Sequence, residues 1–77
     1  MEDEALRTEV ALFRFGVISE LVASRLEPGE LTELIYQKSE QHWNIPGSHR
    51  TRVSAATVRR WLRLYERGGR ELSALMP

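Results

Sequence analysis

Apolar residues recur along this chain at steps of three and four positions, which is the spacing of one face of a helix. The alternation of apolar and polar residues that is typical of strands never extends beyond a few positions. The pattern predicts helices over residues 3–24, 30–43 and 54–67. We therefore expect an all-α fold, a compact bundle of three helices that forms a single domain over residues 1–77.

The first predicted helix carries two apolar stripes. One consists of Leu6, Val10, Phe13, Val17 and Leu21, and the other of Leu12, Phe15, Ile18 and Val22. A helix that is apolar over most of its circumference belongs in the middle of a bundle, so we expect the other helices to cover it. Gly16 interrupts this helix at a cost of about 1 kcal/mol relative to alanine, which predicts that another helix crosses closely there.

Proline and glycine residues interrupt the helical pattern in the middle of the chain. Residues 26–30 form the first break, in which Pro28 is compatible with the opening turn of the second helix. That helix has a face that is apolar at its start and polar towards its end. Residues 44–48 have the composition of a turn, and residues 49–52 continue as a basic connector to the third helix.

The third predicted helix has the clearest division into two faces. We expect Ser54 to cap its start, Gly68 and Gly69 to end it, and the C-terminal segment to fold back onto the core. On a helical wheel an apolar arc of about 120° must face the core. This arc holds Ala55, Val58, Trp61, Leu62 and Tyr65. The C-terminal segment is expected to add Leu72, Leu75 and Met76 to the core. The opposite arc holds Ala56, Arg59, Arg60, Arg63 and Arg67.

The formal net charge of zero conceals a strong separation of charges. Residues 1–46 contain nine acidic and four basic side chains, whereas residues 47–77 contain seven arginines and two acidic side chains. Such segregation favours one functional face over a uniformly solvated surface. Within the third helix, the like-charge pairs Arg59–Arg63 and Arg63–Arg67 each cost a few tenths of a kcal/mol, which an acidic ligand would relieve.

An arginine-bearing face on the third helix of a small bundle points to double-stranded DNA as the partner, in the manner of a helix-turn-helix protein. The planar guanidinium can bind a guanine edge or phosphate oxygens in a bidentate way, and a small side chain permits close approach. We expect base contacts from Ala56, Arg59, Arg60 and Arg63. We expect backbone contacts from Arg50, Arg52 and Arg67, with Thr57 at the boundary between the two groups. Ser54, which caps the helix, completes the expected DNA-binding residues.

Other kinds of site have little support in the sequence. The absence of cysteine removes disulfides and thiolate metal sites and fits a cytoplasmic setting. The only histidines, His42 and His49, do not make a metal site, and no serine has a base at a recognisable spacing. Trp43 and Trp61 are interpreted as core or core-edge anchors. We therefore expect no cofactor, no small-molecule ligand, no membrane contact and no catalytic residue in this chain.

Three segments of the chain also resemble the N-terminal region of bacterial insertion-sequence transposases that have an integrase-type catalytic core. The segments are ALFRFGVISELV, IPGSHRTRVSAATVRRWLRLYERGG and LSALMP, and the resemblance covers roughly residues 5–77. It implies a homeodomain-like helix-turn-helix that binds the ends of the mobile element, with Trp61 buried and Arg59, Arg60 and Arg63 facing outward. It also implies that the chain is a non-catalytic fragment of a longer enzyme, whose catalytic carboxylates lie in a further domain of the parent chain.

Two alternatives remain open at this level. The first is a free-standing transcriptional or phage regulator, because VSAATVRRWLRLYER also resembles the reading helix of MerR-type regulators, although the wing that follows it there is missing. The second is a helical protein-interaction module that uses the acidic half and the basic face to dock or self-associate. Steep salt dependence of DNA binding without homo-oligomers would separate DNA recognition from the second alternative.

Overall fold

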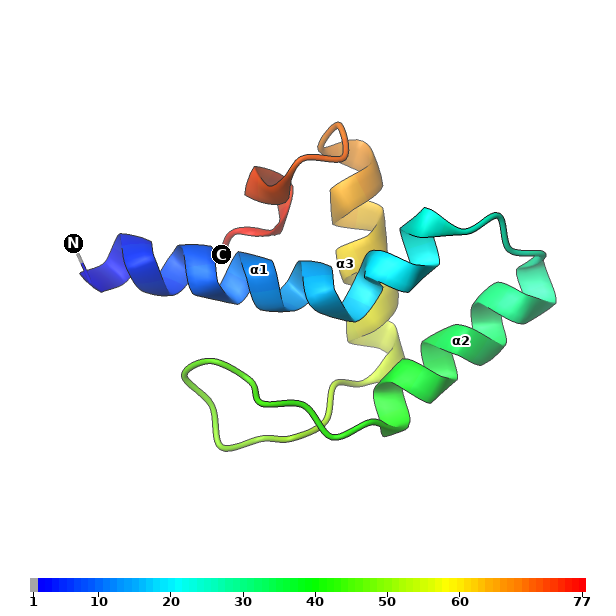
Figure 1. Cartoon of the computed structure of the whole chain (residues 1–77), viewed down its shortest axis with the longest axis horizontal. Coiled ribbons are helices and arrows are strands. Elements are labelled where there is room, and N and C mark those ends of the chain that lie inside the picture. Colours follow the sequence, from blue (N-terminus) through cyan, green and yellow to red (C-terminus); the bar gives the residue numbers. More distant parts are fainter. Residues whose placement is uncertain (1) are drawn as a thin grey trace.

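Three helices and a short 3₁₀ turn make up the fold (Figure 1). The computed structural model describes residues 2–77, so the expected start of the domain at residue 1 lies outside the described residues. The helices are α1 (Glu2–Ala23), α2 (Pro28–Glu40) and α3 (Ala55–Arg67), followed by the 3₁₀ turn η1 (Leu72–Leu75). No strand occurs in the described part of the chain. The predicted all-α fold with three helices is therefore confirmed.

The second helix begins and ends earlier than the sequence pattern predicts. It begins at Pro28 because Glu27 forms a capping box: the Glu27 backbone N–H donates to Glu30 Oε1 at 3.2 Å, while the Glu27 side chain accepts from the Glu30 backbone N–H. It ends at Glu40 rather than at Trp43. Trp43 Nε1 donates to the Lys38 carbonyl oxygen at 2.9 Å, which satisfies a carbonyl of the last turn from outside the helix.

Residues 41–54 consequently form a longer connection between α2 and α3 than the three- or four-residue turn of an ordinary helix-turn-helix. The Trp43 backbone N–H donates to the Thr51 carbonyl oxygen at 2.6 Å and draws the two ends of the connection together. At its far end the Ser48 N–H donates to the Ile45 carbonyl oxygen at 3.2 Å. Gly47 occupies the position of this turn that needs a positive φ, here 72°.

The predicted limits of α3 are confirmed. The Ser54 hydroxyl accepts from the Thr57 backbone N–H at 3.1 Å, the bond expected of an N-cap serine. The helix ends at Arg67, and the left-handed conformations after it belong to Gly69, with φ 79°, and Arg70, with φ 60°, rather than to Gly68. Gly68 serves the fold differently, because a Cβ there would collide with the Ala74 side chain.

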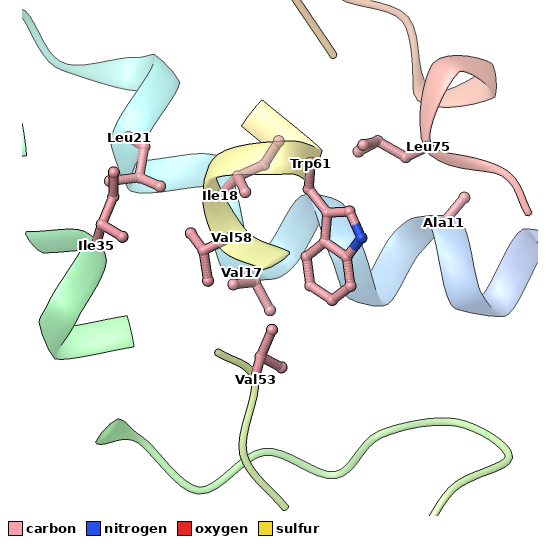
Figure 2. Close-up of a cluster of buried hydrophobic side chains, with 9 residues drawn as sticks. All are labelled: Ala11, Val17, Ile18, Leu21, Ile35, Val53, Val58, Trp61 and Leu75. Atoms are coloured by element: carbon pink, nitrogen blue, oxygen red, sulfur yellow. The ribbon is translucent and has the colours of Figure 1, made fainter. Parts of the chain in front are cut away.

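One hydrophobic core joins all of these elements (Figure 2). The buried apolar side chains are Ala11, Val17, Ile18, Leu21, Ile35, Val53, Val58, Trp61 and Leu75. Phe13 packs edge-on against both Trp61 and Trp43, with ring centroids 6.1 Å and 6.0 Å apart. Both tryptophans are therefore packing anchors, as predicted.

The C-terminal segment folds back onto α1, as the sequence predicts. Leu75 is fully buried, and Leu72 and Met76 pack partly buried against the core. Two arginines of α1 hold this segment through its carbonyl oxygens: Arg14 donates to that of Leu75 at 3.0 Å and Arg7 to that of Pro77 at 3.1 Å.

The prediction that the other helices cover α1 on most sides is wrong. Leu6 and Leu12 remain 45% and 56% exposed, whereas Val17 and Ile18 are fully buried. In Figure 1 α1 extends beyond α2 and α3, and its N-terminal part lies beside the C-terminal segment instead. Only the C-terminal half of α1 therefore meets the helices that could cover a second apolar stripe. No helix in residues 2–77 has the length and apolar character needed to cross a membrane.

Gly16 does not mark a close helix crossing, so that prediction is also wrong. Its position on α1 is exposed, and a Cβ placed there meets nothing within 4 Å. Gly16→Ala should therefore raise the free energy of unfolding by about 1 kcal/mol, because alanine is the better helix former. Thermal or urea unfolding measures the change. Gly68→Ala is the matched control and should lower stability; a destabilised Gly16→Ala protein would contradict the open surroundings described here.

Candidate nucleic-acid interface

The arginine-bearing face of α3 is turned away from the core. Val58 and Trp61 are buried on the opposite face, with Ala55, Leu62 and Tyr65 packed partly buried around them. Four side chains of the outward arc are exposed, namely Ala56, Arg60, Arg63 and Arg67, and the fifth, Arg59, is half-buried. The division into two faces that the helical wheel predicts is confirmed.

The outward arginines of α3 have no salt bridge with any acidic side chain that the structure describes. Glu66 is the acid nearest to them in sequence, but it accepts from Arg70 at 3.0 Å instead of pairing with Arg63. The other salt bridge lies elsewhere, between Glu20 and the buried ammonium of Lys38 at 2.6 Å. Four cationic side chains on one helix thus remain available to an anionic partner.

Helix α2 borders one side of this face. A groove of about 350 Å³ runs between α2 and α3 and has an apolar floor, with two arginines of α3 at its edge. It is lined by Leu31, Thr32, Ile35, Arg59, Leu62 and Arg63. Beside it, the guanidinium carbon of Arg59 lies 5.5 Å from the centroid of the Tyr36 ring. Arg59 is therefore held against α2, whereas no such contact is found for Arg60, Arg63 or Arg67 in the described residues.

The connection 41–54 borders the other side of the face. Arg50 and Arg52 are both exposed on it and line a hollow of about 210 Å³ next to the first turn of α3. Arg52 Nη2 lies 3.3 Å from His42 Nε2, a contact across the base of the connection. The structure thus brings Arg50 and Arg52 to the N-terminal end of α3, as the assignment of backbone contacts to them requires.

The two hydroxyl residues at the start of α3 are bonded to each other. Besides accepting from the Thr57 N–H, the Ser54 hydroxyl donates to Thr57 Oγ1 at 2.9 Å. Ser54 is exposed and Thr57 is half-buried, so Ser54 is the more accessible of the two. Both lie at the positive end of the helix dipole, where an anion is favoured.

Two residues that lie near the arginine face were not predicted from the sequence to do so. Tyr36 belongs to α2 and contacts Arg59, and Arg14 belongs to α1 and lies over the ring of Trp61, which follows Arg60 in the sequence. Burial of its guanidinium, and then the positive charge of Arg60, lower the pKa of Arg14. Arg14 stays charged at neutral pH. Its hydrogen bond to the Leu75 carbonyl oxygen and its position 5.3 Å from the centroid of the Trp61 ring give it a role in stabilising the fold. It adds positive potential beside Arg60 rather than a free donor.

No family model, curated protein or solved structure matches this chain.

Proposed function

We propose that this domain binds double-stranded DNA through the outward face of α3. The observation that carries the proposal is the set of arginines on that face, which no described acidic side chain neutralises, on a well-capped helix whose other face is locked into the core. Phosphate neutralisation supplies most of the affinity of such contacts, and arginine also reads guanine in the major groove.

The geometry supports separate roles for the residues of this face, some in contacts to bases and others in contacts to phosphates. Ala56, Arg59, Arg60 and Arg63 occupy its N-terminal part and middle, where a reading helix meets base edges. Arg67 follows one turn later, while Arg50 and Arg52 flank the start of the helix and are suited to phosphates, together with Ser54 and Thr57. Recognition of transposon ends by the homeodomain-like region of a larger transposase is our more specific proposal, and a free-standing regulator would use the same face.

The protein-interaction alternative has an observation of its own. A hollow of about 250 Å³, which none of the α3 arginines lines, is formed by Leu12, Phe15, Tyr65 and Leu72, and Leu12 is 56% exposed. An apolar surface of this kind can mark a site for another protein. It lies away from the arginines, so the two functions would perturb different residues.

A titration of the ¹⁵N-labelled domain with a random 16-base-pair duplex, followed by NMR at low and at high salt, tests the proposal. We expect shifts concentrated at Arg50, Arg52 and residues 54–67, fading steeply as salt screens the phosphates. No shift at low salt would refute DNA binding. Concentration-dependent shifts around Leu12 and Tyr65 without DNA would instead support self-association.

A further inference from the structure

Tyr36 and Arg59 form the only recorded contact of the outward α3 arginines with an aromatic ring in the described residues. Tyr36 is 51% exposed, so burial of its ring in the core does not account for its position. Arg59 is half-buried, in contrast to the exposed Arg60, Arg63 and Arg67. One of the four arginines is therefore held in a defined place while the other three extend into solvent.

The contact holds the guanidinium without consuming its hydrogen-bond donors. The guanidinium carbon of Arg59 lies over the Tyr36 ring, 5.5 Å from its centroid, and this contact needs no hydrogen-bond acceptor for the five N–H donors. Arg59 has no hydrogen bond and no salt bridge to the side chains that the structure describes. Its donors are thus free for a bidentate contact, and Arg59 lines the neighbouring groove together with Leu31, Ile35 and Leu62.

Ordering a long side chain before binding raises affinity only for ligands that match the ordered geometry. A free arginine loses rotamer entropy of up to about 2 kcal/mol when it is immobilised, and a residue that is already ordered loses less. A phosphate can be met from many directions, but the N7 and O6 acceptors of guanine need one plane and one distance. Prior ordering therefore favours a base contact over a backbone contact.

We propose that Tyr36 is a positioning residue that orients Arg59 to read a guanine in the major groove. This inference rests on the proposed DNA binding and assigns to α2 a part in sequence preference. Arg59 is then the base contact with the most defined geometry on this face, and the freely extended Arg67 contributes chiefly to affinity.

The variants Tyr36→Leu and Tyr36→Phe test this role, because phenylalanine keeps the ring and leucine removes it. Duplexes selected by the unaltered domain from a randomised pool define the preferred base at each position. Tyr36→Leu should reduce the preference for guanine at one position by about two- to fivefold, the value of an exposed cation–π contact. Tyr36→Phe should retain the preference, and the salt dependence should be the same in all three proteins, since no phosphate contact is lost.

A second measurement needs no DNA. In the free domain the Arg59 δ and ε protons should be shifted upfield by the ring in the unaltered protein and in Tyr36→Phe, and not in Tyr36→Leu. The positioning role would be overturned if the unaltered domain shows the upfield shifts but Tyr36→Leu keeps the same base preference. DNA binding itself would then remain intact. Failure of the unaltered domain to bind any duplex would overturn the proposed function and, with it, this role. Absence of the upfield shift would overturn the contact itself.

Discussion

Replacing Arg60 and Arg63 together by glutamine should weaken binding to double-stranded DNA by about a hundredfold or more at low salt. Both side chains are exposed on the outward face of α3 and lack an acidic partner among the described residues. A hydrogen bond to a charged group is worth about 1.5–3 kcal/mol, and two such bonds are lost. Fluorescence anisotropy with a labelled duplex over a range of salt concentrations measures both the affinity and its salt dependence.

The salt dependence makes this expectation specific. Because Arg60 and Arg63 are assigned to base edges, the double variant should lose preference among duplex sequences, while the slope of log K against log salt should change by less than the value of about two expected for two lost phosphate contacts. Arg7→Gln combined with Arg25→Gln removes the same charge from α1 and from the connection that follows it, so it is the matched control. Equal losses of affinity and slope in both double variants would show that net charge, rather than the α3 face, drives binding.

Ile18→Ala should destabilise the domain by about 2–5 kcal/mol, the usual cost of truncating a buried isoleucine. Ile18 is fully buried and belongs to the core that α3 and the C-terminal segment close. For a domain of this size each kcal/mol corresponds to roughly 4–8 °C in Tm, so the fall should be at least about 8 °C. Circular dichroism during thermal unfolding measures it.

Leu12→Ala provides the control within the same stripe of α1. Leu12 is 56% exposed, so its truncation should change stability by only about 0.5 kcal/mol. The two residues are equivalent in the sequence pattern, and only their places in the fold distinguish them. A loss of stability as large in Leu12→Ala as in Ile18→Ala would mean that this stripe of α1 is covered along its whole length in solution.

Much of α3 follows from local sequence. Three of its features depend on neighbours within about one helical turn, which can be read directly from the sequence. They are the cap at Ser54, the end at Arg67, and the separation of the face with Val58 and Trp61 from the arginine face. The end of α2 could not be read in the same way. It depends on Trp43 lying outside the helix, where it donates to Lys38 and to Thr51, and Thr51 lies beyond the turn at residues 45–48.

Spacing and composition alone establish the three helices, the outward direction of four arginines on the third, and the lack of any thiol. Packing in three dimensions determines which part of each α1 stripe is buried, that Gly16 has open space, that Arg59 lies against Tyr36 and that Arg14 lies over Trp61. Helical periodicity states which side chains share a face. Helical periodicity does not show how far a neighbouring helix extends. Packing between segments that are separated in the sequence therefore determines which of those side chains are buried, paired or free.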